Sequence, residues 1–232
     1  MLVAAAVCPC PPLLVPEVAA GAAPELDALR AACSDAVGEL LAADAELIVV
    51  VGTGPKAGVW TEGGAGSFRR YGVDLAVRLP AAGVAGPELA PSLTVGAWLL
   101  ARAGAVLPAH ACAVRPDTTQ ERLHGLGRGL ADLADRVGLL VLGGGSACRS
   151  VKAPGYLDER AEAYDAAAAA ALAAADTAAL NALDPQLSAE LQADGRAPWQ
   201  VLAGAAEGAG LRGRLRYDEA PYGVGYLVAS WL

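Results

Sequence analysis

Apolar runs and helical patterns alternate along this chain. Continuous apolar runs predict buried strands at Leu2–Val7, Leu47–Val51 and Val137–Leu142, because each run is short and is followed by proline or glycine. Two less regular segments, Val73–Leu79 and Ala105–Val114, predict further strands. The order of the segments favours a largely parallel sheet whose strands are joined by helices.

Helices are expected between these strands. Glu25–Leu41 places apolar residues three and four positions apart, with Pro24 near its start. Ala161–Ala175 is almost entirely alanine, which has the highest helix propensity. Further helices are predicted at Leu93–Ala103, from a cap at Asp117 or Thr118 to about Arg136, and as roughly two or three short segments up to Glu207.

The end of the chain predicts an antiparallel pair. Leu211–Tyr217 and Gly223–Trp231 read as strands joined by the turn Asp218–Tyr222. The whole pattern predicts an α/β fold: a three-layer-like sandwich with a central mixed, mostly parallel sheet flanked by helices and closed by this hairpin. With no internal repeat and no interdomain linker, residues 1–232 are expected to form a single domain.

Charge and apolarity exclude several classes of partner. The net charge is −8 with acidic residues spread along the chain, so no basic stripe is present for nucleic acid. No stretch has the length and apolarity of a membrane span, and the first apolar run lacks a basic segment before it. Five cysteines without an export signal predict reduced thiols in a cytoplasmic protein. A small molecule is the expected partner.

The stiffest stretch follows the first strand. Cys8 and Cys10 alternate with prolines, and Pro11 and Pro12 come next, so the loop has little conformational freedom to lose. In an open α/β sheet this edge is where ligands bind. The Cys8 and Cys10 pair could hold Cu(I) or Zn(II), or could simply cap the strand as two small apolar side chains.

Other residues with chemical potential lie in loops and strand ends. His110 is interpreted either as a structural residue or as a catalytic one. Gly143–Gly145 suggests a close approach of backbone to a ligand, or a tight turn. Only two of the 17 basic residues are lysines, Lys56 and Lys152. These lysines could face an anion together with arginines of the loops, namely Arg149, Arg160 and Arg196. Ion pairs with nearby carboxylates are the simpler interpretation of these charges.

In sequence, these segments resemble the catalytic-subunit (B), LigB-like family of class III extradiol ring-cleavage dioxygenases and its Memo-like relatives. CPCPPLLVPEV is similar to the opening Pro-His-Pro-Pro-Leu-Leu/Ile-x-Pro-Glu, and LIVVVGTGP to a strand ending in Ser-Pro-His-Gly-Pro. The segment that contains Glu-His-Ser in the family is similar to AHACAV, and the Gly-Asp-x-Ser-His-Arg loop with the helix after it is similar to VLGGGSACRSVKAPGYLDERAEAYD. The Gly-Glu-Cys-Gly-Trp segment is similar to DGRAPWQVLAGA, and the closing strand is similar to YGVGYLVASW. The resemblance covers nearly the whole chain.

The resemblance also locates departures from the family. Its dioxygenases hold Fe(II) with two histidines and a carboxylate, and by resemblance these positions carry Cys10, Thr53 and Arg196. The loop histidine used in acid–base work corresponds to Ala147 and its neighbouring aspartate to Gly144, so that His110 alone matches a family active-site histidine. At about 4 Å and an effective dielectric constant near 20, each unit of like charge costs about 4 kcal/mol. We therefore expect no Fe(II) at this position.

These departures predict a protein of the dioxygenase fold that has lost its iron site and binds a small anionic or aromatic molecule in the remaining cleft. Cys10, Thr53, His110, Ser146 and Arg196 are expected to line the cleft, with Lys56 and Lys152 at its mouth. Arg149 is a further expected ligand-binding residue.

Three alternatives remain open. The first is a soft-metal protein that gathers Cu(I) or Zn(II) with Cys8 or Cys10 and His110, Cys112 or Cys148. The second is an active iron dioxygenase with rearranged ligands. The third is a thiol enzyme with Cys10 as nucleophile and His110 as base. Members of the family often form dimers, so a homodimer is a candidate assembly, although the sequence carries no interface signal.

Overall fold

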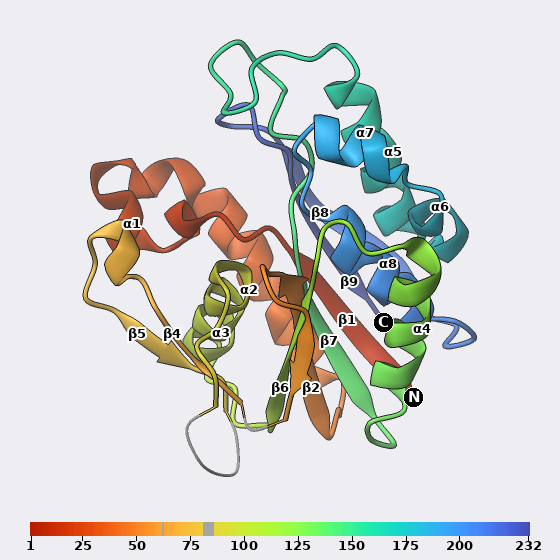
Figure 1. Ribbon diagram of the computed structural model, residues 1–232. Coiled ribbons are helices and arrows are strands. Elements are labelled where there is room, and N and C mark those ends of the chain that lie inside the picture. The colour runs from red at the N-terminus through yellow and green to blue at the C-terminus, as the bar shows by residue number, and fades with distance from the viewer. Residues whose placement is uncertain (62, 81–85) are drawn as a thin grey trace.

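A seven-stranded mixed sheet forms the centre of the computed structural model, which describes residues 1–61, 63–80 and 86–232 (Figure 1). The strand order is β3-β6-β2-β7-β1-β9-β8. Neighbours among β6, β2, β7 and β1 run parallel, whereas β3, β9 and β8 each run antiparallel to the strand beside them. The strands are β1 (Leu2–Cys8), β2 (Leu47–Thr53), β3 (Gly58–Trp60), β6 (Ala109–Val114), β7 (Val137–Leu142), β8 (Gly213–Glu219) and β9 (Tyr226–Trp231).

Helices cover both faces of this sheet, which confirms the predicted fold class (Figure 1). One face packs against α2 and α3, and the other against α4, α5, α6 and α8. A small antiparallel sheet of β4 (Ala65–Ser67) and β5 (Ala76–Arg78) lies beside α3. The helices are α1 (Pro16–Ala19), α2 (Asp27–Ala42), α3 (Pro91–Arg102), α4 (Gln120–Ala131), α5 (Ala161–Ala174), α6 (Thr177–Asn181), α7 (Pro185–Glu190) and α8 (Arg196–Ala205).

Two apolar clusters hold the layers together, one on each side of the sheet. In β1, Ala4 and Ala6 belong to the α2 and α3 side, whereas Ala5 and Val7 belong to the α4 and α8 side. This alternation follows from the two-residue period of a strand. Because the central strands are buried on both faces, their sequences are continuously apolar, as in most parallel sheets.

Most predicted elements appear within a few residues of their expected bounds. The C-terminal pair β8 and β9 is antiparallel, as predicted. The main differences concern short strands: the sequence pattern does not predict β3 and β4, and β6 begins at Ala109 rather than Ala105. None of the described helices is both long and apolar enough to cross a bilayer.

The four parallel strands end at one edge of the sheet. Cys8, Thr53, Val114 and Leu142 are the last residues of β1, β2, β6 and β7. Backbone hydrogen bonds continue past these ends, from Gly143 N to Cys8 O at 3.0 Å and from Gly54 N to Val114 O at 2.9 Å. The loops that leave this edge therefore carry the residues that can meet a ligand.

Candidate functional site

Cys10 and Asp194 meet at the carboxyl edge of the sheet. The Cys10 Sγ lies 3.7 Å from Oδ2 of Asp194, as a thiol donating to a carboxylate. The other oxygen, Asp194 Oδ1, accepts a hydrogen bond from the Gly144 backbone N–H at 2.5 Å. The proline-rich loop after β1, the glycine loop after β7 and the segment before α8 thus converge on one carboxylate.

Cys10 is half-buried, and Asp194 is exposed on one side while its carboxylate contacts neighbouring protein. Partial removal from water raises the pKa of Asp194, and it raises the pKa of the Cys10 thiol well above its ordinary value. The negative charge of Asp194 and its hydrogen bond add to the shift at Cys10. A thiol with a raised pKa is a poor nucleophile near neutral pH, so this arrangement does not favour the thiol-enzyme hypothesis.

Tyr226 adds a third polar group to this part of the edge. It is the first residue of β9, which runs antiparallel to β1 with Val7 opposite Ala229, so Tyr226 lies beyond the end of β1. The side chain is 4% exposed. Burial raises the pKa of Tyr226 to about 12, with further contributions from Tyr222, Asp194 and Cys10. At neutral pH this phenol is a neutral hydrogen-bonding group.

Replacing Asp194 with asparagine is expected to increase the reactivity of Cys10. The substitution removes the charge that disfavours the thiolate, so the Cys10 pKa falls and alkylation by iodoacetamide at pH 8 accelerates by about threefold or more. In the wild type, the rate should still rise by about tenfold per pH unit at pH 9, because the raised pKa lies above that pH.

The other four cysteines are buried, so mass spectrometry should find the label on Cys10. Asp74→Asn, at an exposed aspartate paired with Arg69, is the matched control and should leave the rate unchanged. Rapid labelling of wild-type Cys10 at pH 7 would contradict this account of the pair.

Arg196 does not face Cys10. Its side chain is 2% exposed and donates to Gln200 Oε1 at 2.8 Å, to Thr118 O at 3.3 Å and to Pro116 O. Burial lowers its pKa from the usual arginine range. The expectation that Arg196 stands beside Cys10 in place of a carboxylate is therefore wrong. The group beside Cys10 is the carboxylate of Asp194, and Arg196 holds the loop that follows β6.

Ser146 and Arg149 help to build the loop after β7. The buried carboxylate of Asp165 in α5 accepts from Ser146 N at 2.6 Å and from Arg149 Nη1 at 3.1 Å. Ser146 Oγ donates to Leu191 O at 3.1 Å. Side chains at Gly143 and Gly145 would collide with Gly195 and Asp165, so the glycines here admit neighbouring protein segments.

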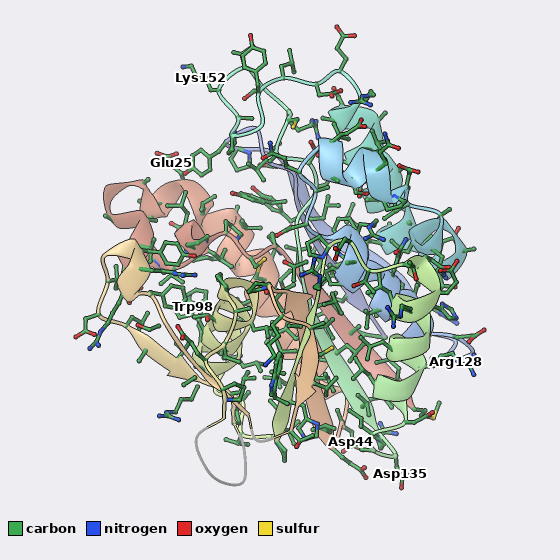
Figure 2. All side chains as sticks on the ribbon, viewed as in Figure 1. Glu25, Asp44, Trp98, Arg128, Asp135 and Lys152 are labelled. Atoms are coloured by element: carbon green, nitrogen blue, oxygen red, sulfur yellow. The ribbon has the colours of Figure 1, made fainter. Side chains whose placement is uncertain are left out.

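Three of the expected ligand-binding residues lie away from Cys10. Thr53 ends β2, where its carbonyl accepts a hydrogen bond from Ser92 Oγ at 2.6 Å. Lys56 is exposed and lines a cavity beside α3. Lys152 is exposed in the loop between β7 and α5, at the outer end of the molecule (Figure 2).

His110 lies toward the opposite edge of the sheet. It is the second residue of β6 and pairs with Val49, four residues before the strand ends at Val114. At about 3.3 Å per residue, this distance is roughly 13 Å along the strand. The structure therefore does not bring His110 together with Cys10. Pro108, directly before the strand, was a signal that β6 begins there.

The cysteines are also dispersed. Cys8 hydrogen-bonds with Cys33 on the α2 side of the sheet, and this contact together with burial raises the pKa of Cys8. Cys112 and Cys148 belong to the cluster on the other face. Across residues 1–61, 63–80 and 86–232, no three His, Cys, Asp or Glu side chains are placed to hold a metal ion.

The residues at the positions that the resemblance assigns to the iron ligands do not fit Fe(II). The contacting donors are one thiol and one carboxyl group, both with raised pKa values, and the second histidine position carries Thr53. Non-haem Fe(II) sites use two imidazoles and a carboxylate on one face of the metal. The side chains at these positions therefore do not supply the ligand set on which ring cleavage by Fe(II) depends.

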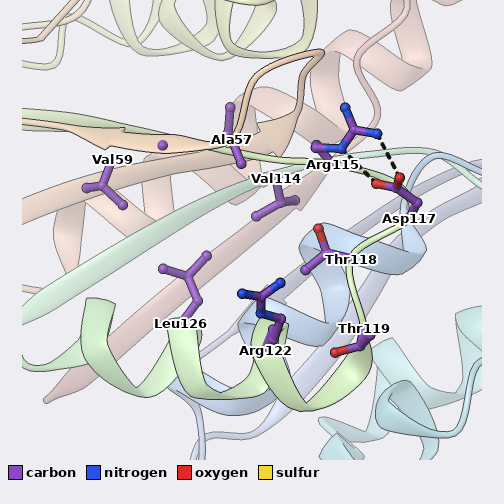
Figure 3. A pocket seen from close by; sticks show the side chains of 11 residues that line it. Ala57, Val59, Val114, Arg115, Asp117, Thr118, Thr119, Arg122 and Leu126 are labelled. Carbon is purple, nitrogen blue, oxygen red and sulfur yellow. Dashed lines mark hydrogen bonds and ion pairs between the residues drawn. The ribbon is translucent and has the colours of Figure 1, made fainter.

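A pocket of about 560 Å³ opens beside the end of β6 (Figure 3). We call it the β6 pocket. Val59, Val114 and Leu126 give it an apolar lining, and Arg115, Arg122 and Thr118 stand around it (Figure 3). Arg115 is paired with Asp117 through bonds of 2.9 and 2.7 Å. Arg122 is exposed and has no ion-pair partner within the described part of the chain.

Arg196 connects the β6 pocket to α8. The carbonyls that Arg196 binds belong to Pro116 and Thr118, in the loop that forms one wall of the pocket. The sequence pattern places Arg196 at a ligand site but does not identify Arg122, Asp165, Asp194 or Tyr226. An arginine within the otherwise apolar start of α8 was a usable signal for a buried, hydrogen-bonded guanidinium.

The fold is similar to that of a known crystal structure, the uncharacterised protein JW3007 from Escherichia coli K12. The TM-score is 0.54 with 13% sequence identity, and the match covers 98% of this chain and 99% of that chain. No family model matches the sequence, and no curated protein is similar to it by sequence. At this identity the likeness concerns the fold alone.

Proposed function

We propose that this chain is a small-molecule-binding protein of the extradiol-dioxygenase fold that takes an aromatic monoanion in the β6 pocket without using iron. The observation that carries the proposal is the pocket itself: an apolar lining beside a guanidinium that no carboxylate of the described residues neutralises. Its volume of about 560 Å³ lies within the usual range for small-ligand sites.

The chemistry of the lining supports a planar apolar body with one negative charge. Val59, Val114 and Leu126 offer aliphatic surface that an aromatic ring can cover. The Arg122 guanidinium, directed across the pocket in Figure 3, can bind a carboxylate with two parallel hydrogen bonds. Because Asp117 already neutralises Arg115, one cation remains for the ligand.

The charge of the surroundings strengthens this choice. The protein has a net charge of −8, so anions are repelled from most of its surface. The β6 pocket holds two arginines and one aspartate, which makes it locally positive. By contrast, Asp194 stands at Cys10, so an anion is less favoured there than in the β6 pocket.

The test is a titration with 2-naphthoate, a planar monoanion, and with 2-naphthamide, its neutral counterpart. We expect 2-naphthoate to bind with a dissociation constant between about 10 μM and 1 mM, and 2-naphthamide to bind at least about tenfold more weakly. Arg122→Gln should weaken binding of 2-naphthoate by about tenfold or more, because a charged hydrogen bond is lost.

Arg128→Gln is the matched control. Arg128 is also exposed on α4 (Figure 2), but it does not line the β6 pocket. This variant should bind 2-naphthoate like the wild type. Equal affinity for the acid and the amide, or an unchanged affinity in Arg122→Gln, would overturn the proposal.

A further inference from the structure

Two neighbouring cavities lie on the other side of β6 from the β6 pocket. One cavity of about 310 Å³ is lined by Lys56, Trp60 and Arg70 among others, and a neighbouring one of about 260 Å³ is lined by Arg70 and Tyr71. The two share Arg70, Glu88, Leu89 and Pro91. The two cavities therefore adjoin each other at the start of α3, and we call them together the α3 groove.

The α3 groove is separate from the β6 pocket but shares a wall with it. Ala113 of β6 lines both, and the loop between β2 and β3 contributes Pro55 and Lys56 to the groove and Ala57 to the pocket. None of the charged side chains is common to the two sites. Each site can therefore be tested by substitutions that leave the other intact.

The polar groups of the α3 groove differ from those of the β6 pocket. Lys56 and Arg70 are both exposed, and neither has an ion-pair partner in the described ranges. Glu88 is also exposed and lines both cavities, yet it forms no ion pair there with Arg70. Two available cations at one cavity match a ligand group with two negative charges, such as a phosphate, better than a single carboxylate.

Aromatic side chains complete the lining. Trp60 is half-buried in β3 and lines the larger cavity, and Tyr71 is 37% exposed beside the smaller one. An indole face is a good stacking surface for a flat heterocycle. A carboxylate such as that of Glu88 is a suitable acceptor for sugar hydroxyl groups.

From this combination we propose that the α3 groove binds a nucleotide, with the base against Trp60, the phosphates between Lys56 and Arg70, and the ribose hydroxyls near Glu88. The three kinds of side chain correspond to the three parts of such a ligand. This site is additional to the β6 pocket, and its ligand differs in charge and in shape.

Equilibrium dialysis with ADP tests the proposal, with adenosine and inorganic pyrophosphate as partial probes. ADP should bind at least about tenfold more tightly than either partial probe, since the base and the phosphates contribute separately. Lys56→Gln and Arg70→Gln should each weaken ADP binding by about fivefold or more. Both variants should bind 2-naphthoate like the wild type, and Arg122→Gln should bind ADP like the wild type.

Arg78→Gln is the matched control, because Arg78 is exposed on β5 nearby but lines neither cavity of the groove. It should leave ADP binding unchanged. Absence of ADP binding at about 5 mM, which corresponds to a binding free energy weaker than about −3 kcal/mol, would overturn the proposal. So would pyrophosphate binding as tightly as ADP, or an equal loss of affinity in Arg78→Gln.

Discussion

Arg196→Met is expected to lower the free energy of unfolding by about 2–4 kcal/mol and to weaken 2-naphthoate binding by about tenfold or more. The guanidinium is 2% exposed and donates to Gln200 Oε1 and to the carbonyls of Pro116 and Thr118. Methionine fills much of the volume but leaves these acceptors without a donor. The loop wall of the β6 pocket should then lose its fixed position.

Urea denaturation followed by circular dichroism measures the first effect, and ligand titration measures the second. Arg196→Lys should recover only part of both, because one ammonium cannot span acceptors on two loop residues and a helix. Arg128→Met, at an exposed arginine of α4, should change stability by no more than about 0.5 kcal/mol. Wild-type stability and affinity in Arg196→Met would show that Arg196 does not hold the loop.

Asp165→Ala is expected to destabilise the protein by about 2–4 kcal/mol. Asp165 is 1% exposed and binds the Ser146 N–H and the Arg149 guanidinium. Its removal leaves a buried N–H without an acceptor and a partly buried cation without its nearest carboxylate. Burial raises the pKa of Asp165 despite the nearby Arg149, so keeping this carboxylate ionised is itself costly. We therefore expect the loss of unfolding free energy to stay below the upper limit for removing one partner of a buried ion pair.

Urea denaturation again provides the measurement. Asp74→Ala removes an exposed carboxylate from a surface pair with Arg69 and should cost no more than about 0.5 kcal/mol. Asp165→Asn keeps an acceptor for Ser146 and should lie between the alanine variant and the wild type. If Asp165→Ala unfolds at the wild-type urea concentration, the contacts of Asp165 do not stabilise the loop after β7.

The central sheet could be predicted because its strands are long, apolar and bounded by proline or glycine. Val137–Leu142 has the same bounds in the sequence prediction and in the structure. β3 and β4 have three residues each, which is too short for a two-residue period to be recognised. β3 depends on its pairing with β6, which is distant in sequence, whereas β4 pairs with the nearby β5.

The candidate site was only partly accessible to sequence reasoning. The sequence correctly places the stiff loop with Cys10 at the carboxyl end of β1, since proline restricts the backbone wherever it occurs. Asp194 was missed because its contact with Cys10 joins residues 184 positions apart. The predicted strand and β6 both end at Val114, so their bounds alone place His110 inside the strand rather than at its carboxyl end.

The resemblance to the dioxygenase family gave positions rather than orientations. It assigned the carboxylate position to Arg196, two residues from Asp194, and an offset of two at the start of a helix changes which way a side chain points. In the structure, Asp194 precedes α8 and faces Cys10, while Arg196 is the first residue of α8 and faces the loop after β6.

The most direct test of metal-independent binding is the affinity for 2-naphthoate, measured once in the presence of a strong chelator and once, anaerobically, with added Fe(II). The proposed function predicts the same dissociation constant under both conditions, since Arg122 and the apolar lining of the β6 pocket need no metal. Binding that disappears with the chelator and returns with Fe(II) would contradict it.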